Sequence, residues 1–279
     1  MGNSMLDDNR KCDTHSGASR VPVLMYHRIG EARNAWESKY CVSPERFAAQ
    51  MHLLAKQGFR AVSIDDFVNW ANRKKELPDN SFLLTFDDGF LGIYDYALPV
   101  LRELAWPATV FLVSGLIGTR DEWCRTENPS GQSHPLLGLR EIEAMVNFGF
   151  GFHSHTRHHK RLPDLPDAEL TDQLAGSRQE LADMLGTPID YLAYPYGLYD
   201  TRVIDATRAA GYTAAFSVQP GFNRFDVDHY RIRRLDIFGT DTPSMLLRKV
   251  KLGTNDGSLR HAAGYYLERL ASRIPGRAR

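Results

Sequence analysis

The chain has 279 residues, of which 43% are hydrophobic and 24% are charged, and its formal net charge at pH 7 is zero. This composition is typical of a soluble globular protein with one large domain or two small ones. A neutral chain has no overall field that would attract nucleic acid. It also lacks an apolar run of about 18 residues, the length needed to span a membrane.

The three cysteines, Cys12, Cys41 and Cys124, are odd in number and far apart, which favours free thiols in a reducing compartment. Residues 1–20 are polar and lack the apolar centre of a signal peptide, so a disordered leader is expected there. A cytoplasmic location is therefore expected.

Strand and helix patterns alternate after residue 20. A buried strand is expected over 21–26. A helix is expected over 43–56, where Ser43 is the N-cap, Pro44 opens the helix and Gly58 follows its end. The later expected strands are 60–64, 82–86, 108–113, 151–154, 191–194 and 213–217, and the later expected helices are 65–73, 93–104, 139–148, 170–185 and 201–210.

Roughly seven or eight such strand–helix units in one chain indicate an α/β fold with a parallel sheet, closed or nearly closed as a barrel. An open doubly wound sheet is the alternative. In a barrel, functional residues lie at the carboxyl ends of the strands. A single barrel domain is expected over 21–240, with residues 118–135 as a long loop near those strand ends and a basic helical extension over 241–279.

Two adjacent carboxylates, Asp87 and Asp88, end the strand expected over 82–86 and precede Gly89. Buried carboxylates need to be paired, hydrated or bound to a cation. Neighbouring side chains of a strand point to opposite faces, but a glycine turn at its end lets both acids reach one pocket. A metal ion there would bind one carboxylate and keep the other ionised as a base.

Four of the ten histidines lie within residues 153–159. His155 and His159 are four residues apart, a spacing that lets two rings converge on one divalent ion. One aspartate of the pair at 87–88 would complete a His-His-Asp set, which leaves positions open for water and substrate, as catalytic sites do. A solvated basic loop is the alternative.

A restrained aromatic turn of Pro195, Tyr196 and Gly197 follows the strand expected over 191–194. Such a turn can present a backbone N–H to a developing oxyanion. Alternatively, it only ends the strand and packs its tyrosines.

Together these features resemble the polysaccharide deacetylase (NodB-homology) family, carbohydrate esterase family 4. The family motif T-F-D-D-G is intact at 85–89, and S-H-T-x-x-H matches 154–159. Residues 21–27, 42–47 and 58–63 are similar to a subgroup that deacetylates exopolysaccharides such as poly-N-acetylglucosamine. The resemblance covers roughly residues 21–238.

The resemblance implies a distorted (β/α)7-type barrel and a metal-dependent hydrolase of N-acetyl (or formyl) groups on a polysaccharide or lipid-linked glycan. Asp87 corresponds to the general base that activates the metal-bound water, and the Tyr196 N–H to the oxyanion donor. Asp88, His155 and His159 correspond to the metal ligands. Zn²⁺ is the expected metal, with Co²⁺, Ni²⁺ or Fe²⁺ as alternatives.

Two family features are missing. The arginine that opens the third motif and pairs with the base is replaced by Ala193, and Arg234 is expected to take over that pairing. The late histidine that acts as the general acid is also absent. His27 is its expected substitute, and the alternative is a histidine that only supports the barrel mouth through hydrogen bonds. His153 and His158 are assigned no role.

From residue 231 on, 11 Lys/Arg and 4 Asp/Glu give a net charge of +7, and residues 258–274 place apolar side chains on one helical face. This face could lie peripherally on an anionic membrane, or pack against its own domain or a partner. Two other functions stay open: deacylation of a small non-sugar amide, and glycan binding without catalysis on the same scaffold. The oligomeric state is not predicted.

Overall fold

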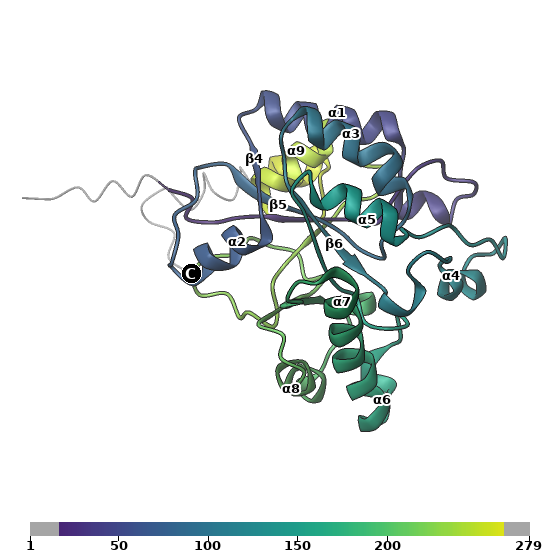
Figure 1. Ribbon diagram of the computed structural model, residues 1–279. Helices are drawn as coiled ribbons and strands as arrows, with labels where there is room; N and C mark the ends of the chain where they lie inside the picture. Colours follow the sequence, from purple (N-terminus) through teal and green to yellow (C-terminus); the bar gives the residue numbers. More distant parts are fainter. Residues whose placement is uncertain (1–16, 265–279) are drawn as a thin grey trace, which may run out of the picture.

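The structure, a computed structural model, describes residues 17–264 apart from the side chain of Thr126 (Figure 1). The strands are β1 (Val23–Tyr26), β2 (Arg28–Ile29), β3 (Cys41–Val42), β4 (Arg60–Val62), β5 (Ser81–Phe86), β6 (Ala108–Leu112), β7 (Phe150–Ser154), β8 (Tyr191–Ala193), β9 (Ala214–Phe216) and β10 (Leu235–Asp236). The α-helices are α1 (Pro44–Lys56), α2 (Ile64–Ala71), α3 (Leu98–Glu103), α4 (Glu122–Glu127), α5 (Leu139–Val146), α6 (Asp167–Thr171), α7 (Ser177–Leu185), α8 (Thr201–Ala209) and α9 (Pro243–Leu252).

A curled parallel sheet forms the centre of the fold, with the strand order β10-β1-β5-β6-β7-β8-β9 and β4 beside the start of β5. Its two ends are bridged through one short segment, because Ile232 pairs with Phe216 of β9 and Leu235 pairs with Leu24 of β1. The predicted α/β fold with a barrel-like parallel sheet is confirmed, and the open doubly wound alternative is wrong.

Side chains alternate between two core layers along each strand, as the pleat of a strand requires. In β5, Phe82, Leu84 and Phe86 pack under the outer helices, whereas Leu83 belongs to a second cluster that includes Phe111 of β6. Figure 1 shows α1, α3 and α9 on one flank of the sheet and α6, α7 and α8 on another. Residue 87 continues the inward series of β5, so the alternation places its carboxylate over the barrel interior.

Two helix starts follow from N-caps. The Ser43 side chain accepts a hydrogen bond from the Arg46 N–H at 3.3 Å, and α1 begins at Pro44 as predicted. The strand predicted over 60–64 ends early, because Ser63 caps α2 by accepting from the Asp66 N–H at 3.1 Å. Ile64 is therefore the first residue of a helix and not the last of a strand.

Other predicted boundaries also need correction. The helices expected over 93–104 and 170–185 contain π-helical turns at Ile93–Ala97 and Asp172–Gly176, so neither is a continuous α-helix. The loop expected over 118–135 contains the short helix α4. Sequence periodicity does not resolve a single π-turn, because it changes the repeat by one residue only.

The chain ends of the described region are packed on the barrel. Ala18, placed in the predicted disordered leader, is buried, and its carbonyl accepts a hydrogen bond from the Trp70 indole at 2.8 Å. Helix α9 contributes Leu246 and Val250 to the core beside α1, so the packed domain continues past residue 240 (Figure 1). Residues 1–16 and 265–279 lie outside the described residues, and with them the end of the basic helical extension predicted over 241–279. Among the helices that are described, none combines the length and apolarity needed to cross a bilayer.

Candidate metal centre and active site

A sharp turn at the end of β5 brings two carboxylates to one place. The Asp87 N–H donates to the Tyr26 carbonyl at 2.9 Å, and the next residues, Asp88 and Gly89, have φ angles of 73° and 77°. A left-handed conformation costs a non-glycine residue roughly 1–2 kcal/mol, so the surrounding structure must hold Asp88 in place. The predicted convergence of the two acids is thereby explained by the backbone.

Asp88 lies between the two predicted histidine ligands. Its Oδ1 atom is 3.4 Å from Nε2 of His155 and 3.4 Å from Nε2 of His159. Within the described part of the chain, these three residues are the one group of His, Cys, Asp or Glu whose ligand atoms all lie within 4.8 Å of one another. Asp88 comes from the turn after β5, and His155 and His159 come from the segment that follows β7.

The His155 ring is oriented by a backbone group. Its Nδ1 is 2.8 Å from the Ala193 carbonyl. Because a carbonyl oxygen only accepts hydrogen bonds, Nδ1 carries the proton and Nε2 keeps a free lone pair directed at Asp88. The His159 ring is held between two aromatic rings, Trp123 and Tyr196, each with its centroid 4.6 Å away.

The charges of this group fit a bound cation. Asp88 Oδ1 is buried and has no hydrogen-bond partner among the described residues, and the 3.4 Å separations exceed those of good hydrogen bonds. Burial raises the pKa of Asp88 well above its ordinary value, and the neighbouring carboxylates Asp87 and Asp121 raise it further. A divalent ion bound to Asp88 would offset its burial, the repulsion from the neighbouring carboxylates and the missing hydrogen bond.

Asp87 has a different partner. The Arg234 guanidinium donates two parallel hydrogen bonds to its carboxylate, at 2.6 and 2.8 Å, and donates a third from Nε to the Ser217 carbonyl at 2.9 Å. Arg234 is fully buried and Asp87 is 2% exposed. Burial by itself would raise the pKa of Asp87, but Arg234 and His155 outweigh it and lower the pKa to about 2. Arg234 therefore makes the pairing that Ala193 cannot.

A pocket of about 430 Å³ opens above this group, and His27, Asp88, His159 and Tyr196 are among its lining residues. His27 is the first residue after β1, and burial lowers its pKa to about 4, an effect that Asp87 partly offsets. The Tyr196 backbone has a φ of 58° in the turn after β8. The structure thus brings six of the seven predicted site residues to the carboxyl ends of strands, and the seventh, Arg234, reaches Asp87 from just before β10. Their roles stay predictions.

Sequence reasoning missed several pocket residues. The same pocket is lined by Trp36, Asp121, Trp123 and Glu127. Trp123 and Glu127 belong to the six-residue helix α4, which is too short to show a periodic pattern, and the other two lie in irregular segments. A tryptophan between acidic residues at 121–127 was the available signal. The two histidines without a role lie elsewhere: His153 packs against Tyr191 at 4.6 Å between ring centroids, and His158 pairs with Gln173 at 2.9 Å.

Comparison with known proteins identifies the fold and the motifs. A family model described as polysaccharide deacetylase matches residues 74–215, which is half of the chain. The chain belongs to the polysaccharide deacetylase family. The matched part of this deacetylase contains Asp87, the Asp88–His155–His159 group and Tyr196, whereas His27 and Arg234 lie outside it. The predicted class of enzyme, a carbohydrate deacetylase, is confirmed.

Individual relatives agree with the family. The poly-beta-1,6-N-acetyl-D-glucosamine N-deacetylase of Staphylococcus epidermidis is 27% identical over 205 residues, which cover 70% of this deacetylase and 68% of the relative. The structure of IcaB from Ammonifex degensii matches with a TM-score of 0.70 and 25% identity, over 86% of this chain and 99% of that one. The Streptococcus pyogenes deacetylase PplD shares the fold, with a TM-score of 0.70 and 23% identity over 83% of this chain and 98% of that one.

Proposed function

We propose that this deacetylase is metal-dependent and removes N-acetyl groups from amino sugars of an exopolysaccharide of the poly-N-acetylglucosamine type. One observation carries the proposal: a carboxylate without a hydrogen bond lies between two histidine nitrogens, directly beside a second carboxylate that an arginine keeps ionised. The named activity of the Staphylococcus epidermidis relative supports the substrate class.

Asp88, His155 and His159 would hold the ion, and Zn²⁺ suits two imidazole nitrogens with one carboxylate oxygen. When bound, such an ion acts as a Lewis acid on the amide carbonyl and makes a water molecule more acidic. The Ala193 carbonyl accepts the Nδ1 hydrogen of His155 and so fixes the tautomer and direction in which Nε2 would bind the ion.

The other residues of the site move protons and stabilise charge. Asp87 accepts the proton of the attacking water, and its bidentate contact with Arg234 fixes the carboxylate in one orientation. The Tyr196 N–H donates to the oxyanion that develops on the amide carbonyl. His27 lines the pocket near Asp87. Because burial keeps the pKa of His27 low, the neutral ring relays to the departing amine the proton that Asp87 takes from the water.

The test measures acetate released from β-1,6-linked and β-1,4-linked N-acetylglucosamine oligomers and from a small N-acetylated amine without a sugar. The wild type is compared with Asp88→Asn, and His158→Ala is the matched control because His158 lies away from the pocket. We expect release from the β-1,6-linked oligomers by wild type and control, and at least about a hundredfold less from Asp88→Asn. Release from the small amine alone would favour a non-sugar deacylase. Glycan binding without any release would favour a silent binding protein.

A further inference from the structure

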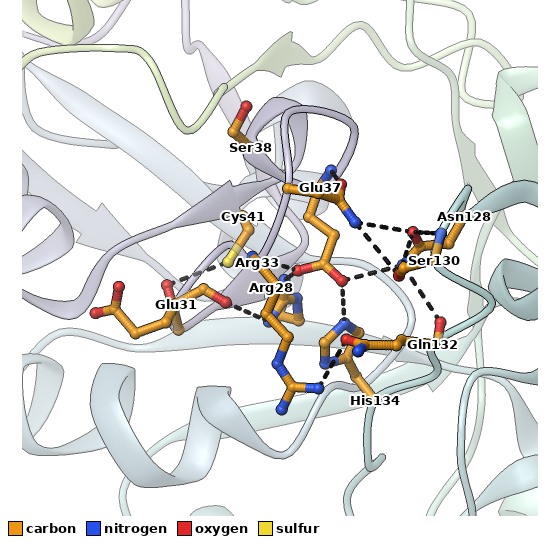
Figure 2. Close-up of polar contacts among 12 residues, drawn as sticks. Arg28, Glu31, Arg33, Glu37, Ser38, Cys41, Asn128, Ser130, Gln132 and His134 are labelled. Atoms are coloured by element: carbon orange, nitrogen blue, oxygen red, sulfur yellow. Dashed lines mark hydrogen bonds and ion pairs between the residues drawn. The ribbon is translucent and has the colours of Figure 1, made fainter.

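A buried carboxylate joins two loops that are far apart in the sequence (Figure 2). We call residues 30–40 the first loop and residues 118–136 the second loop. Glu37 of the first loop accepts hydrogen bonds at Oε2 from the Arg28 guanidinium at 2.7 Å and from the Arg33 N–H at 2.8 Å. Its Oε1 atom is 3.0 Å from the Asn128 amide and 2.9 Å from His134 Nε2, both in the second loop.

This carboxylate is the buried part of the contact between the loops. The contacts of Oε1 with Asn128 and His134 are both buried, whereas the hydrogen bond from Arg33 to Gln132 is exposed. Hydrogen bonds to a buried charged group are stronger than exposed ones, because water competes less and an unpaired charge is costly. Asn34 of the first loop also donates to the Asn128 side chain at 3.0 Å, in a partly buried contact. The two loops are therefore joined through Glu37 and Asn34, and Glu37 makes the fully buried part of the contact.

The charge of Glu37 is held by its donors. Burial by itself raises the pKa of Glu37, but the Arg33 N–H, His134 and Arg28 outweigh that effect and lower the pKa to about 2. Glu37 is consequently ionised over the whole working pH range. Its removal would take a shared acceptor from four donors, two of them in buried contacts, although the Asn128 amide would keep its hydrogen bond to the Gln132 carbonyl at 3.3 Å.

Both loops line the pocket above the metal group. Trp36 and Tyr40 come from the first loop, and Trp123 and Glu127 from the second. The second loop is fixed on its other side as well, since the Tyr196 hydroxyl donates to Glu127 at 2.9 Å. The position of the aromatic rings around the pocket thus depends on the contact that Glu37 makes next to Trp36.

We propose that Glu37 is a positioning residue for the substrate: it fixes the two loops so that Trp36 and Trp123 face a bound sugar chain. The apolar faces of sugar rings pack on aromatic side chains, and such a subsite needs rings that are held before the substrate binds. Glu37 acts through the loops and does not touch the reacting atoms. This inference rests on the proposed deacetylase function.

The experiment uses the metal-loaded full chain with Glu37→Ala, Glu37→Gln and the matched control Glu31→Ala, an exposed carboxylate of the same loop. Hydrogen exchange reports on the second loop directly. We expect its amides, such as that of Leu136, to exchange at least about tenfold faster in Glu37→Ala and at the wild-type rate in the control.

Kinetics separate positioning from mere folding. In Glu37→Ala we expect KM for N-acetylglucosamine oligomers to rise about tenfold or more while kcat stays within threefold. The rate of hydrolysis of p-nitrophenyl acetate, which is too small to span both loops, should stay within twofold of wild type. Glu37→Gln should show a smaller rise in KM than Glu37→Ala. His134→Ala removes the same contact from the other loop, so a double variant should be no worse than Glu37→Ala alone.

Two results would overturn the inference alone: an unchanged KM and exchange rate in Glu37→Ala, or an equal loss of kcat on both substrates, which would show a structural role. A wild type that binds the metal and hydrolyses p-nitrophenyl acetate, but releases no acetate from any glycan, would instead refute the proposed function and this inference with it.

Discussion

The buried pair of Arg234 and Asp87 makes the sharpest prediction, through the substitution Arg234→Met. Methionine fills a comparable apolar volume but leaves Asp87 without its cation. The pKa of Asp87 would then rise from about 2 past its ordinary 3.8, because the largest effect that opposes its burial is gone. The change is at least about two pH units, or roughly 2.5 kcal/mol. Breaking a buried ion pair costs roughly 3–5 kcal/mol, so we expect a loss of that order in the free energy of unfolding.

The effect on activity should depend on pH in a definite direction. A base is active when deprotonated, so a higher pKa for Asp87 reduces activity most at low pH and least at high pH. Activity falls about tenfold for each pH unit below the pKa of the base, so we expect the kcat/KM ratio of Arg234→Met to wild type to be lowest at pH 5.5 and to rise toward pH 9. The assay is acetate release at saturating metal between pH 5.5 and 9.

A second buried ion pair provides the control. Lys249 of α9 and Asp241 are 1% and 2% exposed and form this pair, and Lys249 is not among the residues that line the pocket. Lys249→Met should lower the free energy of unfolding by a similar amount, yet keep a constant activity ratio to wild type at every pH. If Arg234→Met also keeps a constant ratio, Arg234 does not tune Asp87 and the reasoning is refuted.

Three further predictions concern single residues. Asp87→Asn should lower kcat by roughly 10²–10⁴-fold while the protein still binds one metal ion, and activity above one tenth of wild type would contradict the base assignment. His155→Ala should abolish metal binding measured by calorimetry, whereas His153→Ala, two residues earlier on the same inward face, should keep it; equal losses would point to misfolding. His27→Gln should lower kcat by roughly 10²-fold with little change in KM, and a neutral result would leave the proton donor unassigned.

The grouping of Asp88, His155 and His159 was predictable because it follows from local rules. Asp88 and His155 each come directly after a strand with a clear apolar pattern, and the carboxyl ends of neighbouring parallel strands meet at one edge. The strand order that brings them together was implied by the alternation of strands and helices. The left-handed backbone at Asp88 and His159 was not predictable, because no glycine marks those positions.

Long-range pairings were harder to predict. Arg234 is 147 residues from Asp87 in the sequence, and only the bridge between β9 and β1 places its guanidinium under the base. The motif comparison pointed to Arg234, but composition and periodicity alone did not. Glu37 and His134 were missed entirely, since they are 97 residues apart and both lie in irregular segments.

The most direct test of the central claim is a metal titration of acetate release. The purified chain is treated with chelator, dialysed, and then assayed on β-1,6-linked N-acetylglucosamine oligomers as Zn²⁺ or Co²⁺ is added. We predict no release from the metal-free chain and full activity at one equivalent of metal, with no recovery in Asp88→Asn. Acetate release that persists after complete metal removal, or a loaded chain that releases none, would contradict the account.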